Sequence, residues 1–261
     1  NNYDVQGCLN YNKAVMDRLT NTSDGWYLNY IRLHIDPYWT NNRGASVPEN
    51  DISQFNMTNF QNCVNQVIIP LIEHAKSRGM YVILRPPGVC PDRIALNDAY
   101  YNYLVTVWSY LSQHMGLKNR DNVMFELANE PVNIRASDGT YGQDAQKYYD
   151  ALKSFFQPIV NLIRNNGANN VIWIPGLGYQ SLYRGLANNR ISGSNIGFAV
   201  HVYPGYWGMD LNNTTNFNNG WNTHIKPVAD IAPIVITETD WGPSQYNVWG
   251  KGGTTSGFGT N

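Results

Sequence analysis

The sequence predicts an α/β fold with a parallel sheet, and three observations support this prediction. Short β-branched runs alternate with longer stretches in which apolar residues recur every three or four positions, as in repeated strand–helix–strand units. The strand cores, such as Tyr81–Leu84 (YVIL), are nearly continuous in apolar residues, which indicates strands that are covered on both faces. Neither Gly-x-Gly-x-x-Gly after the first strand nor GxxxxGK with Ser or Thr occurs, so an open nucleotide-binding sheet is disfavoured. We therefore predict a (β/α)8 barrel.

The first part of the chain is predicted to form strands on either side of a long helix. A strand is expected around Val5–Leu9, and the β-rich run Tyr27–Ile35 (YLNYIRLHI) forms the next one. A helix covers Asn59–Arg78, because its apolar residues recur at helical spacing and Gly79 follows as a stop signal. The strand Tyr81–Leu84 comes directly after it.

The remaining elements continue the same alternation. A helix within Leu96–Met115 stops at Gly116, and a second helix over Ala145–Arg164 is ended by Asn165-Asn166-Gly167. Shorter helical patterns cover Ser181–Ala187 and Trp221–Ala229. The other strands are β-rich runs between these segments, and they cover Asn122–Ala128, Asn170–Ile174, Ile196–Tyr203 and Pro233–Thr237.

One domain is expected over residues 1–261, because a single α/β barrel routinely occupies about 200–250 residues. No closing strand is recognisable after Trp241, since Gly250–Thr260 is polar and rich in glycine. We therefore expect a barrel without its final strand and helix in this chain, with residues 241–261 as a glycine-rich tail; truncation, a divergent subfamily and an inactive relative are the alternative explanations.

The composition excludes two classes of partner. The formal net charge is −1 and no basic run is longer than two residues, whereas nucleic-acid and anionic membrane surfaces need a concentrated positive patch. The chain is rich in Asn and holds 8 Trp and 18 Tyr, a composition common in secreted proteins that handle carbohydrate; a biased genome explains it equally well. We expect a secreted protein. Its three cysteines permit one disulfide, and the sequence does not select the pair.

Carboxylates follow two of the predicted strands, where a barrel places its chemistry. Glu130 comes after Asn122–Ala128 and is followed by a proline, so it is expected at the mouth of the barrel. Glu126 lies deeper on the same face and is interpreted as a buried acid paired with Arg32 or Arg85. A surface loop acid remains the alternative for Glu130.

The second carboxylate is Glu238 or Asp240, which share a face after the strand Pro233–Thr237. Glu238 is nearer the strand and is therefore better fixed. Two carboxylates from different strands are the minimal equipment of a glycosidase, one to protonate the leaving oxygen and one to attack or to activate water. A separation of about 5–5.5 Å predicts retention of the anomeric configuration, and about 6.5–9.5 Å predicts inversion.

Other polar residues are expected at the same end of the strands. His201 and Tyr203 end one strand on a common face, where they can orient a glutamate or bind sugar hydroxyls. Arg32 and His34 share a face on an earlier strand, and a permanent cation there favours an ionised nucleophile. Each of these residues alone is as well explained by ordinary packing in the core. Their joint placement at the ends of the strands is what indicates a functional site.

Tryptophans follow several strand ends, and indole faces stack on pyranose rings. Trp39, Trp207 and Trp241 are candidates for sugar subsites, with ordinary loop packing as the alternative. The five histidines lack HxH or HExxH spacing, so no metal and no cofactor are expected. A serine hydrolase is disfavoured because no G-x-S-x-G elbow occurs.

Taken in order, these residues resemble glycoside hydrolase family 5, the cellulase and mannanase family of retaining βα-barrel glycosidases. The resemblance rests on Asn129-Glu130-Pro131, His201-x-Tyr203, Ile236-Thr237-Glu238 and Arg32, and it spans roughly residues 25–242. The chain departs from the family at the third strand, where Arg85-Pro86-Pro87 stands in place of a histidine.

The resemblance implies a role for each matching position. Glu130 is the general acid/base and Glu238 the nucleophile. Asn129 binds the sugar 2-hydroxyl, and Arg32 stabilises the charge of the nucleophile. His201 supports the acid and Tyr203 supports the nucleophile.

The resulting hypothesis is a retaining endo-β-1,4-glucanase, a cellulase that cleaves internal bonds of plant cell-wall polysaccharide. An endo-β-1,4-mannanase or another β-glucan hydrolase of the same clan is the alternative within this chemistry. A non-catalytic carbohydrate-binding barrel is the alternative from another class. The expected partner is the polysaccharide substrate, with no nucleic acid and no membrane. The chain is expected to be a monomer, either with carbohydrate-binding or linker modules removed from it or without such modules.

Overall fold

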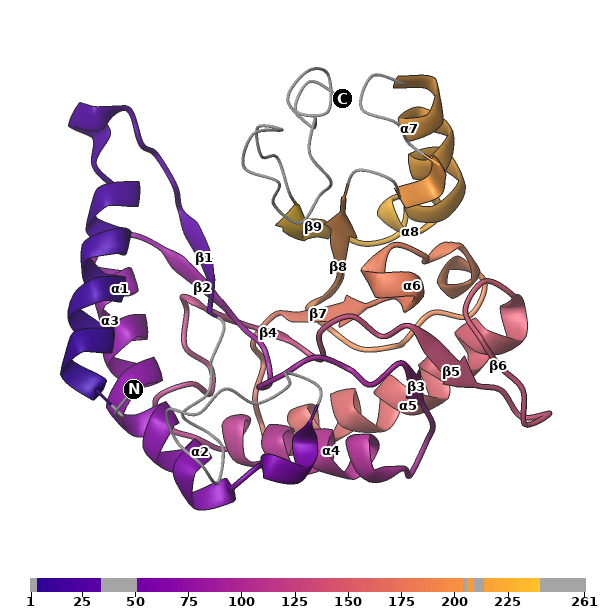
Figure 1. The fold of residues 1–261 in the computed structure, drawn as a ribbon, viewed down its shortest axis with the longest axis horizontal. Coiled ribbons are helices and arrows are strands. Elements are labelled where there is room, and N and C mark those ends of the chain that lie inside the picture. Colours follow the sequence, from indigo (N-terminus) through magenta and orange to yellow (C-terminus); the bar gives the residue numbers. More distant parts are fainter. Residues whose placement is uncertain (1–3, 34–50, 204–205, 209–213, 240–261) are drawn as a thin grey trace. The chain divides into compact units, whose positions relative to one another are not determined.

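The structure, a computed structural model, describes residues 4–33, 51–203, 206–208 and 214–239 (Figure 1). The chain forms two compact units. Unit 1 comprises residues 1–90, 99–129 and 159–172, and unit 2 comprises residues 91–98, 130–158 and 173–261. None of the described helices is long and apolar enough to cross a membrane.

The main sheet is parallel in every strand pair whose register is described, namely β1 with β2, β2 with β4, and β8 with β9. Its strand order is β1-β2-β4-β7-β8-β9. Strand β7 (Ile172–Pro175) belongs to both units, since Ile172 is the last residue of unit 1 and Trp173 belongs to unit 2. Helices connect successive strands of this sheet, so the predicted parallel α/β fold is confirmed.

The strands of unit 1 form its buried centre. They are β1 (Tyr30–Leu33), β2 (Tyr81–Leu84) and β4 (Val123–Glu126). Three successive residues of β2 are fully buried, which means that both faces of this strand are covered. Helix α3 packs on β2, and α1 packs on α3 (Figure 1). The pattern of continuous apolar strands is therefore explained by coverage with helices.

The predicted strand around Val5–Leu9 is wrong, because these residues begin helix α1 (Val5–Leu19). The Asp4 carboxylate caps this helix by accepting a hydrogen bond from the Gly7 backbone N–H at 2.8 Å. Leu9 and Met16, two helical turns apart, are its buried residues. A segment of five residues is too short to reveal its period, and here the cap at Asp4 and the buried Met16 show that it is helical.

The predicted helix Asn59–Arg78 is confirmed as α2 (Met57–Cys63), a π-helical segment (Val64–Ile68) and α3 (Ile69–Ser77). The π-helical segment directly precedes Pro70, which has no N–H to donate to the preceding turn. Unit 2 repeats this arrangement: a π-helical segment (Trp221–Ile225) precedes Pro227 at the start of α8 (Lys226–Ala229). A proline thus follows each of the two π-helical segments.

Two longer helices complete the predicted set. Helix α4 (Ala99–Leu111) belongs to unit 1 and buries Trp108, whose indole N–H donates to the Leu127 carbonyl at 2.9 Å. Helix α5 (Gln146–Asn165) begins in unit 2 and ends in unit 1. Both helices lie where the apolar periodicity predicts them.

Unit 2 contains the last two strands of the main sheet, β8 (Ile196–Val202) and β9 (Ile234–Thr239). A small second sheet, which the sequence does not predict, joins β3 (Arg93–Ile94), β5 (Asn133–Arg135) and β6 (Tyr141–Gly142). Strands of two or three residues are too short to carry a periodic signal. The other described helical segments of unit 2 are short: α6 (Leu177–Gln180), a 3-10 turn (Arg184–Ala187), a 3-10 turn (Tyr206–Gly208) and α7 (Thr214–Gly220).

Candidate active site

The pairing of β8 with β9 brings the predicted residues of unit 2 together. Along most of the pair the register is regular, with Val200 opposite Ile236, but His201 lies opposite Glu238. Thr237 is therefore an extra residue in β9, and the ladder has a bulge at this point. A bulge changes the direction of the side chains that follow it. The side chains of β9 therefore do not alternate regularly between the two faces of the sheet, and the position of Glu238 cannot be obtained by counting along the predicted strand.

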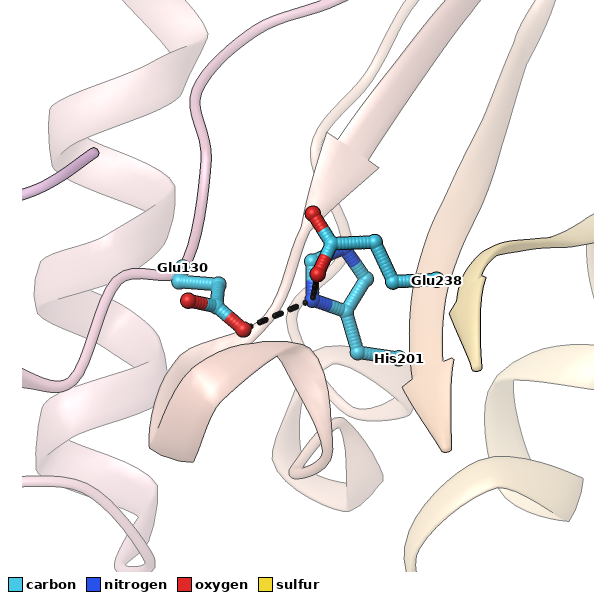
Figure 2. A group of neighbouring side chains, drawn as sticks. All are labelled: Glu130, His201 and Glu238. Atoms are coloured by element: carbon cyan, nitrogen blue, oxygen red, sulfur yellow. Dashed lines mark hydrogen bonds and ion pairs between the residues drawn. The ribbon is translucent and has the colours of Figure 1, made fainter. Parts of the chain in front are cut away.

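Two carboxylates meet at one imidazole nitrogen (Figure 2). His201 Nδ1 lies 3.0 Å from Glu130 Oε1 and 3.5 Å from Glu238 Oε2. The His201 side chain is fully buried, whereas the side chains of Glu130 and Glu238 are 16% and 24% exposed. The buried histidine thus supports two carboxylates that remain within reach of a ligand from solvent.

The same three side chains form the group that could hold a metal ion among the described residues, because their ligand atoms all lie within 4.8 Å of one another. Imidazole and carboxylate are ligands that zinc accepts. The prediction that the protein needs no metal remains a prediction.

One tyrosine donates to Glu238, and a second tyrosine lies within the electrostatic influence of both carboxylates. The Tyr203 hydroxyl donates a hydrogen bond to Glu238 Oε2 at 2.9 Å. Burial raises the pKa of Tyr203, and the adjacent Glu238 charge raises it further. Burial also raises the pKa of Tyr206, with further contributions from the charges of Glu130 and Glu238. Both phenols therefore stay protonated at neutral pH and can act as donors.

Tyr206 is a site residue that the sequence reasoning missed. Its ring centroid lies 5.7 Å from that of Tyr203. It belongs to the 3-10 turn after β8, where no period of two or 3.6 points to an inward face. Its position three residues after the end of the predicted strand Ile196–Tyr203, beside Trp207, was the available signal.

Trp207 was predicted as a sugar subsite, and the structure gives it extensive contacts within unit 2. Its indole N–H donates to the Ser181 carbonyl at 3.1 Å. Its ring is parallel to that of His224, with centroids 6.1 Å apart, and meets Phe217 edge to face. A Cβ atom on Gly220 would lie 2.5 Å from the indole, so this glycine permits the close approach. These contacts fix the half-buried indole, and its role toward sugar stays a prediction.

In unit 1, Arg32 binds the buried Glu126. Arg32 Nε lies 2.5 Å from Glu126 Oε2, and Nη2 lies 3.2 Å from Oε1. Glu126 is fully buried, and its pairing with Arg32 agrees with the interpretation of Glu126 as a buried acid paired with an arginine. A two-point guanidinium–carboxylate pair is the strong form of this contact.

Arg32 also orients Asn129, because Nη2 donates to Asn129 Oδ1 at 2.5 Å. The amide nitrogen of Asn129 therefore carries the remaining donors of this side chain. Asn129 is 2% exposed. The predicted action of Arg32 on the nucleophile stays a prediction.

Four residues that the sequence brought into consideration, His34, Trp39, Asp240 and Trp241, lie outside the described residues. The same holds for the residues after Trp241, where the sequence predicts that the closing strand is missing.

Comparison with known proteins gives a consistent family. A model of the cellulase family (glycosyl hydrolase family 5) matches residues 3–249. An endoglucanase of Bacillus sp. (strain KSM-635) is 26% identical over 240 residues, which are 88% of this chain and 23% of that protein. A cellulase of Thermoanaerobacterium sp. is 26% identical over 135 residues, which are 51% of this chain and 32% of that protein. The chain thus spans about a quarter to a third of these curated relatives.

Solved structures show the same fold. A β-glucanase from Saccharophagus degradans in complex with cellotetraose has a TM-score of 0.66 at 19% identity, covering 94% of this chain and 67% of that one. The catalytic domain of an endoglucanase from Thermobifida fusca has a TM-score of 0.56 at 21% identity, covering 88% and 62%. These likenesses, together with the parallel sheet, confirm the predicted α/β barrel class.

Proposed function

Because the chain belongs to the cellulase family, glycosyl hydrolase family 5, we propose that it is a retaining endo-β-1,4-glucanase. The observation that carries this proposal is the placement of Glu130 and Glu238 on one nitrogen of His201, with all ligand atoms within 4.8 Å. One oxygen of each carboxylate thus lies within 4.8 Å of the other, which favours the roughly 5–5.5 Å separation of retaining glycosidases over the roughly 6.5–9.5 Å of inverting ones.

The hydrogen-bond partners of Glu130 and Glu238 differ, and this difference indicates which carboxylate plays which catalytic role. Glu238 accepts a hydrogen bond from the Tyr203 hydroxyl, and a donor favours the ionised carboxylate that a nucleophile needs. Glu130 faces an imidazole nitrogen, which accepts or donates according to its tautomer and charge. Such a partner suits a group that must be protonated in one step and ionised in the next. We therefore assign Glu238 as nucleophile and Glu130 as acid/base.

The reaction then has two steps. In the first, a Glu238 oxygen attacks the anomeric carbon, the glycosidic bond breaks, and Glu130 transfers its proton to the departing oxygen. In the second, Glu130 takes a proton from water, the water oxygen attacks the anomeric carbon, and the bond to Glu238 breaks. Two inversions leave the configuration unchanged. Tyr203 donates to Glu238 when this carboxylate is ionised, since its phenol remains protonated.

The names of the relatives support a β-glucan as substrate. They are an endoglucanase, a cellulase and a β-glucanase solved with cellotetraose. A polymer of this kind cannot enter a cell, so we also propose that the protein acts outside the cell. We propose that it acts as a monomer; size-exclusion chromatography with light scattering tests this, and a dimer mass would contradict it.

The test is reducing-sugar release from carboxymethylcellulose, lichenan, xyloglucan, xylan and glucomannan. We compare the wild type with Glu130→Gln, Glu238→Gln and the control Asp138→Asn. Asp138 is a carboxylate of unit 2 that is bound to Lys147 at 2.8 Å. Both glutamate variants should lose activity by orders of magnitude, and the control should keep it. Near wild-type turnover in either glutamate variant would remove the assignment.

Two further readouts separate the alternatives. A 2-deoxy-2-fluoro cellobioside with a good leaving group should add one glycosyl mass to a peptide containing Glu238, and proton NMR should show the β-anomer as first product. A first product of α configuration contradicts retention. Preference for mannan over glucan selects the mannanase alternative, and binding of cello-oligosaccharides in calorimetry without any product selects the non-catalytic barrel.

A further inference from the structure

The backbone turn at Gly178–Gln180 has an uncommon conformation. Gly178, Tyr179 and Gln180 have φ values of 56°, 58° and 58°. Left-handed backbone of this kind is disfavoured for residues with a Cβ atom, and two such residues in succession are rare. Glu130 has the same conformation, with φ of 58°. Strained backbone persists only where its surroundings enforce it, so the contacts between these two segments are informative.

The turn binds three successive residues of the segment that carries the acid/base. The N–H of Gly178 donates to the Val132 carbonyl at 3.2 Å, and the N–H of Tyr179 donates to the Pro131 carbonyl at 3.1 Å. The Glu130 N–H donates to the side-chain oxygen of Gln180 at 2.8 Å. All of these residues belong to unit 2. The left-handed turn thus directs two backbone donors and one side-chain acceptor to Glu130 and the two residues after it.

The other end of the Gln180 amide is bound to strand β8. Its nitrogen donates to the Ala199 carbonyl at 3.0 Å, and Gln180 is fully buried. Ala199 lies two residues before His201, and His201 Nδ1 meets Glu130 Oε1 at 3.0 Å. Glu130 is therefore held at both ends from the same strand: its backbone through Gln180, and its carboxylate through His201.

We propose that Gln180 is a positioning residue for the acid/base Glu130. Its amide accepts from the strained backbone of Glu130 and donates to β8, and so sets the distance between the Glu130 carboxylate and His201. The proposal rests on the assignment of Glu130 above. Removing the amide should let the Glu130 backbone relax, and a displacement of about 1 Å at a catalytic group can cost roughly 10²-fold in rate.

The test uses aryl β-cellobiosides with different leaving groups, because only a poor leaving group needs a proton from Glu130. We measure kcat/KM for the phenyl and the 2,4-dinitrophenyl compounds. Gln180→Leu should lower kcat/KM roughly 10–100-fold for the phenyl compound, and only slightly for the dinitrophenyl compound. For the latter, azide should raise a reduced kcat and yield the β-glycosyl azide, since azide needs no base. Equal losses with both leaving groups would overturn the proposal.

The chain offers a matched control in Gln157. Its amide also bridges backbone, donating to the Ser192 carbonyl at 2.9 Å and accepting from the Ser192 N–H at 2.8 Å. Gln157→Leu should leave the ratio of the two kcat/KM values unchanged. Titration of active enzyme with the 2-fluoro cellobioside corrects all rates for unfolded protein.

Gln180→Glu keeps the proposal testable if the leucine variant does not fold. A protonated carboxyl group at this position can accept from Glu130 and donate to Ala199, whereas an ionised one repels the Ala199 carbonyl. The ratio of kcat/KM for the phenyl compound to that for the dinitrophenyl compound should therefore return toward the wild-type value as pH falls, and a pH-independent ratio would contradict the proposal.

Glu130→Gln in the same assay separates the assignment of Glu130 as acid/base from the positioning role of Gln180. If it shows no dependence on the leaving group, the assignment of Glu130 fails; if it shows one and the Gln180 variants do not, the positioning role alone fails.

Discussion

Replacing Tyr203 by Phe removes one hydrogen bond to the proposed nucleophile and little else. The phenol donates to Glu238 Oε2 at 2.9 Å, and hydrogen bonds to charged groups contribute about 1.5–3 kcal/mol. Glu238 also lies 3.5 Å from His201 and its side chain is 24% exposed, so water can replace part of the lost contact. We therefore take the lower value, about 1.5 kcal/mol, which corresponds to a roughly tenfold change in rate.

The loss should be independent of the leaving group, because the nucleophile attacks whichever aryl group departs. Tyr203→Phe should lower kcat/KM about tenfold for both the phenyl and the dinitrophenyl β-cellobioside. The acidic limb of the pH–rate profile should move to higher pH, since a donor that favours the ionised carboxylate is lost. This pattern differs from that expected for Gln180→Leu, which affects only the phenyl compound strongly.

Tyr149 provides the control, because its hydroxyl donates to the Asp144 carboxylate at 2.6 Å elsewhere in unit 2. Tyr149→Phe removes a hydrogen bond of the same type and should leave both kcat/KM values within about twofold of the wild type. The reasoning is refuted if Tyr203→Phe keeps full activity, or if its loss is confined to the poor leaving group.

Three other measurements follow from the same contacts. Burial raises the pKa of Tyr206 and other phenols above the ordinary value of 10.0. The free energy of unfolding should therefore be constant up to about pH 10 and fall as the pH rises beyond it. Urea denaturation between pH 7 and 11 measures this, and an unfolding free energy that does not fall would contradict it. Arg32→Met leaves the buried Glu126 without its guanidinium and should lower the unfolding free energy by about 3–5 kcal/mol, measured by urea denaturation, with Glu126→Gln in the same chain expected to recover part of the loss. EDTA should not change hydrolysis, whereas Zn²⁺ should inhibit competitively by binding His201 and the two carboxylates; loss of activity in EDTA would require a metal-dependent step.

The sequence predicts those parts of the fold that depend on long apolar runs. Strands β2, β4 and β8 lie within or overlap their predicted ranges, because strands covered on both faces must be apolar whatever they contact. The prediction of a strand at Val5–Leu9 is wrong, because so short a segment is compatible with either period and the cap at Asp4 starts a helix there. The small sheet of β3, β5 and β6 has strands too short to show an apolar pattern, so it could not be predicted from the sequence.

Only those residues of the candidate site that are ionisable and lie at strand ends could be predicted from the sequence. Glu130, His201 and Glu238 were each predicted from their place after or at the end of a strand, and the structure brings them together. Gln180 was not predictable, because an uncharged side chain in a left-handed turn has no local signature. Its conformation depends on carbonyls far along the chain, at Pro131 and Val132.

The two carboxylates differ in how the fold holds them, and this difference supports their roles independently of any relative. Glu238 lies within the ladder of β9, directly after a bulge, and accepts from a phenol that stays protonated. Glu130 lies outside a strand, in strained backbone that a buried amide binds, and faces an imidazole that can accept or donate. A nucleophile must remain ionised and fixed, whereas an acid/base must change its proton between steps. If the roles were exchanged, Glu238→Gln, rather than Glu130→Gln, would keep its activity on the dinitrophenyl substrate and respond to azide.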